Sequence, residues 1–362
     1  MDLHIFNPEH DMVLAYAGKH LNCSHTVQEL RMNLGWLPAL WARDGDVVLV
    51  DDAAFAVKAA TKTKLPKADV LFLQVEDIKG QRFDCIHPWG WDAALRTMLI
   101  ANRISSPSIP DDNRLACIRR LSSRQLTTEA LPFLRRGIED VTCGRSVFVD
   151  GSSTDGIAEA MESLRDISAS FVLKSPWSSS GRGIRYVDGG GADGNTTRWI
   201  TNTMHRQGGI MVEPYYKKVR DLAMEFDMKD GTAVYRGLSL FLTRNGSYTG
   251  NLITTEEQKQ KHLSTYIPPA LLKEVRERIC NFANRRLGGI YEGPFGVDMM
   301  IVAAGKFLLH PCVEINLRRT MGHAALSLPA SDALPDRVMT ITHDVNYRLK
   351  VRPIGNNFVQ IL

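Results

Sequence analysis

The sequence predicts an α/β protein: an N-terminal domain with an open α/β sheet, followed by a larger part in which strands and helices are mixed. Three observations support this prediction. Strands alternate with helices in the first third of the chain, a strand–loop–strand unit spans residues 171–187, and a long β-hairpin spans residues 293–318. A chain of 362 residues, of which 44% are apolar and 23% charged, is long enough for two or three domains with cores of their own.

The elements of the first third follow from short apolar runs bounded by turn residues. Asp92 is a suitable N-cap for the last helix of this part. A segment rich in Ser, Pro and Asp marks the end of the domain at residues 105–113. An open α/β sheet presents ligand loops after its strands, so we expect a small molecule to bind there. The predicted strands lie within residues 3–6, 45–52, 68–75 and 83–91, and the predicted helices within 26–42 and 91–104.

The remaining elements are read in the same way. A basic helical segment at 113–126 and a turn and helix at 150–167 precede the strand–loop–strand unit, and a flexible loop follows it at 188–195. Two strands come next, at 209–216 and 220–228. The segment 269–289 predicts a helix that ends near Gly288 and Gly289. Its apolar face is formed by Leu272, Val275, Ile279 and Phe282. The hairpin then turns near Ala304 and Gly305.

Composition excludes several classes of protein. The net charge is only +4 and no basic run exceeds two residues, so nothing favours a nucleic-acid or anionic-membrane partner. The six cysteines lie far apart, without a metal-binding or disulfide pattern. The N-terminus lacks the pattern of a secretory signal, and no apolar window is long enough to span a membrane. We therefore expect a cytoplasmic protein with reduced thiols.

The loop in the strand–loop–strand unit has the composition of an anion site. Glycines allow a close approach of backbone N–H groups to a phosphate, and hydroxyl and cationic side chains add donors. An ordinary hairpin turn is the alternative. The residues concerned are Lys174 at the entrance of the loop, followed by Ser178, Ser179, Ser180, Gly181, Arg182 and Gly183.

Acidic residues at strand positions form a second candidate site. Glu213 ends one predicted strand and Asp221 begins the next; each can equally be a solvated acid. In the hairpin, Asp298 lies within an apolar strand, and Glu314 and Asn316 are two residues apart, so the latter two share a face. Oxygen ligands of this kind suit Mg²⁺. The alternative is an ion pair between one of the carboxylates and Arg318.

These elements, in this order, resemble the ATP-grasp superfamily. The stretch "FVLKSPWSSSGRGI" is similar to its lysine and glycine-rich loop, "VEPYYKKVRD" to its adenine hinge and ribose acid, and "GVDMMIV…VEINLR" to its metal hairpin. The motifs look nearest to the branch of formate-dependent glycinamide ribonucleotide transformylase and biotin carboxylase. The resemblance implies a pre-ATP-grasp domain at 1–112, a small lobe at 113–210 and a large lobe with a C-terminal extension at 211–362, the ATP-grasp part being α+β.

The resemblance also implies roles for the candidate residues. Lys174 would contact the α-phosphate and the edge of the adenine, and the loop would close over the β- and γ-phosphates. Glu213 and the backbone of Tyr216 would hold the adenine, and Asp221 the ribose. Asp298, Glu314 and Asn316 would hold one or two Mg²⁺ ions, with Mn²⁺ as an alternative, and Arg318 together with Lys174 would be catalytic. A further basic residue is expected within 113–126, Arg114 in preference to Arg119. Asp298 and Glu314 are 16 residues apart (314 − 298), which is long for the family hairpin, and a bulge at His310 and Pro311 would absorb the excess.

The implied activity is an ATP-dependent ligase that activates a carboxylate as an acyl phosphate and couples it to an amine or thiol. A small-molecule kinase and a non-catalytic nucleotide-binding module are alternatives. The acceptor site is expected between the first domain and the hairpin, and homodimer formation is left open. Candidate substrate residues, which a polar turn or aromatic packing would explain equally well, are Asn7, Glu9, His10, Asp11, His87 and Trp89.

Overall fold

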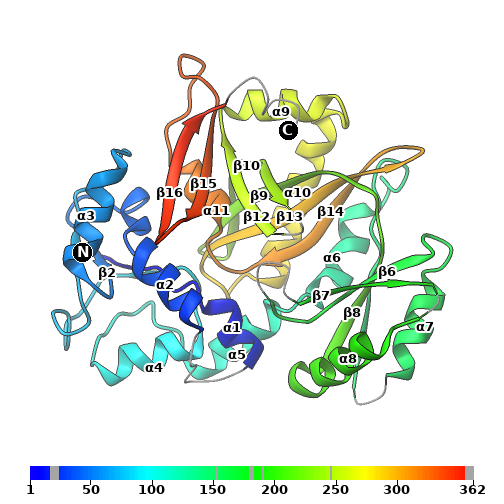
Figure 1. Cartoon of the computed structure of the whole chain (residues 1–362), viewed down its shortest axis with the longest axis horizontal. Helices are drawn as coiled ribbons and strands as arrows, with labels where there is room; N and C mark the ends of the chain where they lie inside the picture. Colours follow the sequence, from blue (N-terminus) through cyan, green and yellow to red (C-terminus); the bar gives the residue numbers. More distant parts are fainter. Residues whose placement is uncertain (17–23, 152–153, 179–182, 190, 245–246, 355–362) are drawn as a thin grey trace.

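The computed structural model of the chain describes residues 1–16, 24–151, 154–178, 183–189, 191–244 and 247–354. Within these ranges the strands form four sheets of four strands each, and helices lie between and around them (Figure 1). The mixed α/β class predicted from the sequence is therefore confirmed. None of the helices in the described part of the chain is long and apolar enough to cross a membrane.

The N-terminal sheet is parallel and has the strand order β3-β2-β1-β4. Its strands are short apolar runs, and Leu3 and Val47 in its centre are fully buried. Asp52 and Asp92 each accept a backbone N–H as N-caps, so the predicted cap of the last helix is confirmed. The elements are β1 (Leu3–Ile5), α1 (His10–Tyr16), α2 (His25–Leu34), η1 (Leu37–Leu40), β2 (Val47–Leu49), α3 (Ala53–Thr63), β3 (Leu71–Leu73), β4 (Ile86–Pro88) and α4 (Ala93–Ala101).

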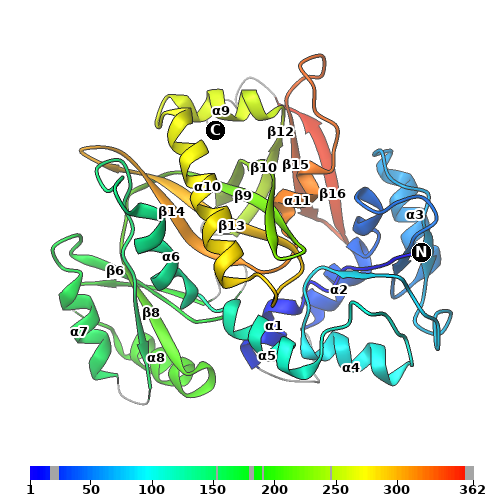
Figure 2. The same cartoon turned by 180° about the vertical axis from the view of Figure 1, so that it is seen from behind.

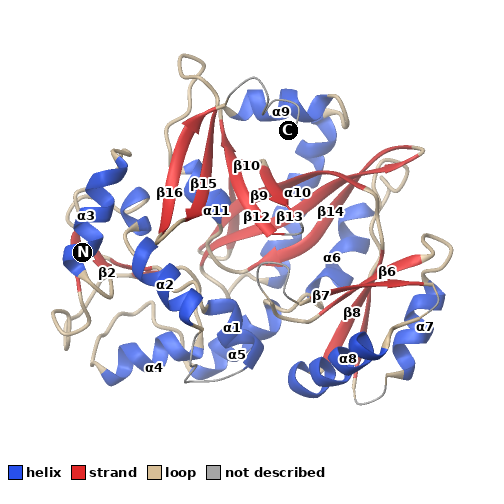
Figure 3. Cartoon of the chain, viewed as in Figure 1, coloured by secondary structure: helices blue, strands red, loops and turns tan. Residues whose placement is uncertain are grey.

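The second sheet is antiparallel and has the order β5-β8-β6-β7. Helices α7 and α8 pack against it with a shared cluster of buried apolar residues, and both lie on the same side of the sheet (Figure 3). Strands β6 and β7 confirm the predicted strand–loop–strand unit. The elements are β5 (Val147–Asp150), α7 (Asp155–Ser163), β6 (Ser170–Lys174), β7 (Ile184–Asp188), α8 (Gly194–Gln207) and β8 (Gly209–Pro214).

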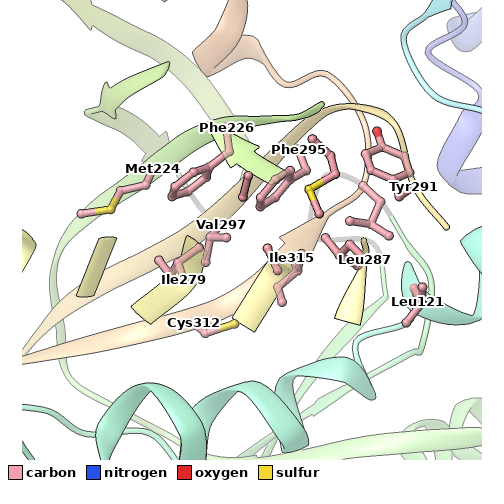
Figure 4. Packing of buried hydrophobic residues seen from close by; sticks show 14 of the residues in the cluster. Leu121, Met224, Phe226, Ile279, Leu287, Tyr291, Phe295, Val297, Cys312 and Ile315 are labelled. Carbon is pink, nitrogen blue, oxygen red and sulfur yellow. The ribbon is translucent and has the colours of Figure 1, made fainter. Parts of the chain in front are cut away.

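The third sheet, with the order β10-β9-β13-β14, is the centre of the molecule. Helix α10 (Pro269–Arg286) lies across its back, as Figure 2 shows. The predicted apolar face of α10 is buried, and the rings of Phe226 and Phe295 stack beneath it at 5.0 Å (Figure 4). The elements are α5 (Asp112–Leu121), α6 (Leu126–Arg135), β9 (Lys218–Lys229), β10 (Thr232–Ser239), β13 (Gly293–Ala304) and β14 (Lys306–Asn316).

The fourth sheet has the order β11-β12-β15-β16 and packs against the N-terminal domain. A second apolar core contains residues of the N-terminal domain, such as Trp36, together with Met339 of this sheet and Ala324 of α11. The N-terminal domain is thereby packed onto the C-terminal part. The elements are β11 (Phe241–Arg244), β12 (Ser247–Ile253), α9 (Glu256–Ser264), α11 (Met321–Leu326), β15 (Arg337–His343) and β16 (Tyr347–Pro353).

Some predicted boundaries differ from the observed ones. The helix expected at 26–42 is two elements, α2 and η1. Helix α8 begins at Gly194, inside the segment predicted as a loop. The proposed domain limit between residues 210 and 211 falls within β8, which belongs to the small-lobe sheet, so a limit after Pro214 fits the strand pairing better. The limit after residue 112 stays a prediction.

Candidate active site

The face of the central sheet opposite α10, here called the front face, carries polar residues predicted for the site. Residues paired across neighbouring strands project from the same face of a sheet. The strand register therefore places three rows of side chains on one face. These rows are Asp221–Met300–His310, Ala223–Asp298–Glu314 and Glu225–Gly296–Asn316, running from β9 through β13 to β14.

Asp298 and Glu314 face each other in the middle row. Burial, together with the charges of Glu314 and Glu225, raises the pKa of Asp298 to about 8. Asn316 donates from Nδ2 to Asp298 at 3.1 Å. The three residues predicted as metal ligands are thus brought together by the hairpin. Two opposed carboxylates and an amide are a donor set that a divalent cation would stabilise.

A bulge in β14 brings about this alignment. Asp298 pairs with Glu314 and Met300 with His310, so three residues of β14 lie opposite Met299 alone. The bulge contains Pro311, which cannot donate a ladder hydrogen bond. The expected bulge is confirmed, and it accounts for the 16 residues between the two carboxylates (314 − 298).

Arg124 connects the hairpin to the serine–glycine loop (residues 175–183). Its guanidinium lies 2.9 Å from Glu314 and donates to Ser178 Oγ and to the carbonyl of Ser175, both at 2.7 Å. This arginine is almost fully buried and was missed in the sequence, where its only signal is its place at the end of the basic segment.

The two arginines favoured from the sequence lie elsewhere. Arg114 donates from Nε to the carbonyl of Ile290 at 2.6 Å. Arg119 donates to the carbonyl of Leu14 and stacks on the ring of Trp177 at 3.9 Å. Neither arginine is placed against Glu314, where Arg124 lies instead, and the assignment of Arg114 to the nucleotide stays a prediction.

Of the serine–glycine loop, only part is described. The backbone N–H of Ser175 donates to the carbonyl of Gly183 at 2.8 Å, and a Cβ at Gly183 would lie 2.0 Å from Ser175 Oγ. Only glycine allows that approach of the two ends of the loop. The predicted residues Ser179, Ser180, Gly181 and Arg182 lie outside the described residues.

Lys174 and Glu213 form a buried ion pair on the small-lobe sheet. Lys174 ends β6, Glu213 lies near the end of β8, and Nζ and Oε2 are 2.6 Å apart. The side chains are 8% and 5% exposed, so the pair is removed from water. Their positions are diagonal neighbours on one face of the sheet. The pairing explains how two charges are retained in the interior.

Tyr216 and Asp221 follow β8 along the chain. The hydroxyl of Tyr216 accepts the backbone N–H of Arg145 at 3.1 Å, and burial raises its pKa to about 12. Asp221 accepts from Lys218 at 2.5 Å and from the hydroxyl of Thr243 at 2.6 Å. Tyr216 therefore ties the hinge to the segment before β5, and Asp221 is held at the edge of the front face.

Arg318 contacts the N-terminal domain. Its Nε donates to both carboxylate oxygens of Asp11, at 2.9 and 3.1 Å. This pair joins the first turn of α1 to the end of the hairpin segment 293–318. A small cavity lies beside it, so the loop, the hairpin and α1 meet at one place. The cavity is lined by Asp11, Ser178, Glu314, Asn316 and Arg318, among others.

The other predicted substrate residues have different surroundings. Asn7 and His10 both contact Asp92 Oδ2, at 2.9 and 3.2 Å. Glu9 pairs with Arg31 at 2.9 Å. Asn7 and Glu9 line a cavity of about 620 Å³ at the carboxyl ends of β1, β2 and β3, where an open α/β sheet binds ligands.

His87 and Trp89 have structural contacts. His87 lies 3.1 Å from Asp2, and the ring of Trp89 packs edge-on against Phe6 in the second core. Neither residue lines the 620 Å³ cavity. These contacts fit the alternative explanation for the two residues, which is packing rather than substrate binding.

Glu225 and His323 were not among the predicted site residues. Glu225 is 1% exposed, and Oε2 lies 3.0 Å from His323 Nδ1. That nitrogen already accepts the backbone N–H of Thr320, while Nε2 donates to the carbonyl of Phe226. No hydrogen bond therefore joins the two side chains, and Glu225 Oε2 has no hydrogen-bond partner among the described residues. Glu225 adds a third carboxylate to the front face, next to Asp298.

Comparison with known proteins gives matches of structure only. No protein-family model matches the sequence, and no curated protein matches it. N5-carboxyaminoimidazole synthetase from Staphylococcus aureus is 12% identical, with a TM-score of 0.52 over 99% of this chain and 95% of that one. Its ADP complex is 13% identical, with a TM-score of 0.50 over 94% and 82%. Biotin carboxylase from Campylobacter jejuni is 12% identical, with a TM-score of 0.51 over 94% and 75%.

These neighbours are ATP-grasp enzymes, and the match extends over nearly the whole chain. The chain therefore has the ATP-grasp fold, with an α/β domain in front of it. The fold predicted from the three motifs is confirmed.

We predict that Asp11→Asn destabilises the protein. The change leaves Arg318 without its anionic partner at a position where both side chains are only 17% exposed. The expected loss is about 1–2 kcal/mol of unfolding free energy, less than for a fully buried pair. Urea denaturation measures it. Asp112→Asn, which removes the partner of Arg96 at the surface, is the control and should change little; equal losses in the two variants would contradict the prediction.

A pH dependence of stability follows from two buried histidines. Burial, together with the nearby charges of Lys174 and Arg135, lowers the pKa of His310 to about 3. Burial, together with His87, lowers the pKa of His4 to about 4. Below the unfolded pKa of about 6.5, the unfolded chain binds protons that the folded chain does not. Stability is therefore lost as pH falls from about 6.5 toward 4, by up to about 1.4 kcal/mol per pH unit for each histidine.

Urea denaturation at pH 7.5 and pH 5 tests this dependence. His310→Leu should lose less stability than the natural protein over that range, because one of the two titrating groups is gone. Parallel curves for the two proteins would show that His310 does not stay neutral in the folded state.

Proposed function

We propose that the protein is an ATP- and Mg²⁺-dependent ligase that activates a carboxylate as an acyl phosphate and couples it to an amine or, less often, a thiol. One observation carries the proposal. The base of the serine–glycine loop, the metal hairpin and α1 of the N-terminal domain meet around one cavity, lined by Ser178, Glu314, Arg318 and Asp11. A triphosphate on one side and an acceptor on the other would fit only if the loop and the hairpin move apart, because the present cavity measures only about 10 Å³. The ADP complex of the S. aureus synthetase and the ATP-analogue complex of biotin carboxylase support the nucleotide.

The nucleotide would lie along the front face of the central sheet. Lys174 and Glu213 would hold the adenine together with the backbone near Tyr216, and Asp221 the ribose. Lys174 lies 2.6 Å from Glu213, so it can contact a nucleotide only if this ion pair is weakened or broken. Arg124, already bound to Ser178 and Glu314, would bind the phosphates with the serine–glycine loop.

The metal would be held by Asp298, Glu314 and Asn316. Within the described residues, no three His, Cys, Asp or Glu side chains converge as a ready-made metal site, so the amide of Asn316 would complete the set. Burial and the charges of Glu314 and Glu225 raise the pKa of Asp298, and this direction supports a cation at the site, which would stabilise the charged carboxylates. When bound, Mg²⁺ neutralises phosphate charge during phosphoryl transfer.

The reaction needs positioning and charge more than covalent help from the protein. The substrate carboxylate attacks the γ-phosphorus, the bond to the β-phosphate oxygen breaks, and ADP leaves. The amine then attacks the acyl carbon, loses a proton and displaces inorganic phosphate. Arg318, held by Asp11, and Lys174 would stabilise the transferred phosphoryl group. Exclusion of water protects the acyl phosphate from hydrolysis.

The substrate is expected on the N-terminal side of Arg318. The first turn of α1 carries His10 and Asp11 and separates the small cavity from the 620 Å³ cavity at the strand ends. Asn7, Glu9 and His10 would therefore bind the acceptor. The partners we propose are small carboxylates and amines, in the cytoplasm, where the five described cysteines stay unpaired thiols. No nucleic-acid or membrane partner is included, and homodimer formation stays open.

A phosphate-release screen tests the proposal. The protein is incubated with ATP, Mg²⁺ and pairs of amino acids, dipeptides and small carboxylates, and products are identified by mass spectrometry. A condensed product with stoichiometric ADP is expected. A phosphorylated product alone would indicate a kinase instead. ATP binding without turnover across the screen would favour the nucleotide-binding module.

A further inference from the structure

His310 is a buried polar side chain without a hydrogen-bond partner in the described part of the chain. It is 0% exposed, and neither Nδ1 nor Nε2 has a hydrogen-bond partner among the described residues. Burying a hydrogen-bonding group without a partner costs stability, usually about 1–3 kcal/mol. An apolar residue would fill this place at a lower cost, so the imidazole calls for a functional explanation.

The register places His310 on the front face of the sheet. It shares a row with Asp221 and with Met300, which lies between the two. This row is next to the row of the metal carboxylates Asp298 and Glu314. A nucleotide with its phosphates at the carboxylates and its ribose at Asp221 would therefore have its base near Met300 and His310.

The contacts of His310 lie on the same side as the adenine residues. Its ring packs edge-on against the ring of Tyr216, with centroids 5.4 Å apart. Burial, together with the charges of Lys174 and Arg135, lowers its pKa, so the ring is neutral at physiological pH. A neutral imidazole has one N–H donor and one nitrogen acceptor. A purine likewise presents both donors and acceptors along its edges.

Gly144 lies against the Nε2 edge of the ring. A Cβ at Gly144 would lie 2.8 Å from Nε2 of His310, and Gly144 has φ of +112°, which favours glycine. The imidazole is thus confined between Gly144 and Tyr216, and its orientation is set by packing. A confined polar group is suited to binding a ligand because little side-chain entropy is lost.

We propose that His310 is a nucleobase-binding residue that forms a hydrogen bond with the base held at Lys174 and Glu213. This inference rests on the proposed function, because it requires that ATP binds on the front face. It assigns the base end of the nucleotide to β14 as well as to the hinge, and it makes the residue just before the bulge part of the binding site.

The test compares ATP with inorganic tripolyphosphate, which lacks the base and the ribose. Isothermal calorimetry measures the Kd of each, with Mg²⁺, for the natural protein, His310→Leu, His310→Asn and the control His205→Asn, an exposed histidine of α8. We expect His310→Leu to raise the Kd of ATP about tenfold and to leave that of tripolyphosphate unchanged. His310→Asn keeps a donor and an acceptor and should recover most of the affinity.

The outcomes separate the inference from the proposed function. An unchanged Kd of ATP in His310→Leu, or equal weakening for ATP and tripolyphosphate, overturns the inference and leaves the ligase proposal standing. A natural protein that binds neither compound overturns both. Thermal melting of each variant shows whether it is folded, and His310→Asn covers the case in which His310→Leu is not.

Discussion

Replacing Glu314 with Gln is expected to lower ATP turnover at least 100-fold while the protein stays folded. The change removes one of the two opposed carboxylates and therefore the charge that would hold a divalent cation at Asp298 and Asn316. The amide oxygen of Gln can still accept from Arg124, which is 2.9 Å from the carboxylate, so the link to the serine–glycine loop is kept. Coupled ADP production under saturating substrate measures the effect.

The control for this variant is Glu277→Gln. Glu277 is an exposed residue of α10, and the same chemical change there should leave turnover as it is. Retention of more than a third of the natural rate in Glu314→Gln would refute the metal assignment.

Replacing Lys174 with Met should cost about 3–5 kcal/mol of unfolding free energy, the largest effect on stability that we predict. The change leaves Glu213 as an uncompensated charge at a site where the two side chains are 8% and 5% exposed. The double variant with Glu213→Leu removes the charge as well and should regain most of the loss, because apolar residues of similar size can replace a buried ion pair.

The two variants are distinguished by urea denaturation and by ATP binding. Both should bind ATP at least tenfold more weakly, since neither has the lysine that we assign to the phosphates and the adenine. The assignment of the pair would fail if the single variant were as stable as the natural protein. The nucleotide role of Lys174 would fail if the double variant bound ATP normally.

The strands and their pairing could be largely predicted from the sequence. Alternating side chains in the hairpin predict that Glu314 and Asn316 share a face, and Pro311 predicts the bulge that aligns them with Asp298. Helix α6 could not be predicted in this way, because Pro132 lies inside it and normally interrupts a helix. Helix α8 begins with Gly194 and is rich in Thr and Asn, residues of low helix propensity.

Some of the site residues could be predicted from the sequence and others could not. The loop, the hinge and the hairpin are local motifs, and the sequence shows each of them. Contacts between distant segments are not encoded in a local pattern. Arg124 meets Glu314 across 190 residues, and Asp11 meets Arg318 across 307 residues. Choosing Arg124 among the arginines of its segment requires knowing which one faces the loop, and that depends on the packing of α5 and α6.

The bulge in β14 has a consequence for how this hairpin can change in length. It adds an even number of residues, because three residues of one strand lie opposite one of the other. His310 below it and Glu314 above it thus keep the same orientation. Loss of a single residue there would move the side chains of β14 on one side of the bulge to the opposite face of the sheet. Loss of two residues would only remove the bulge. Homologous chains should therefore differ at this point by pairs of residues.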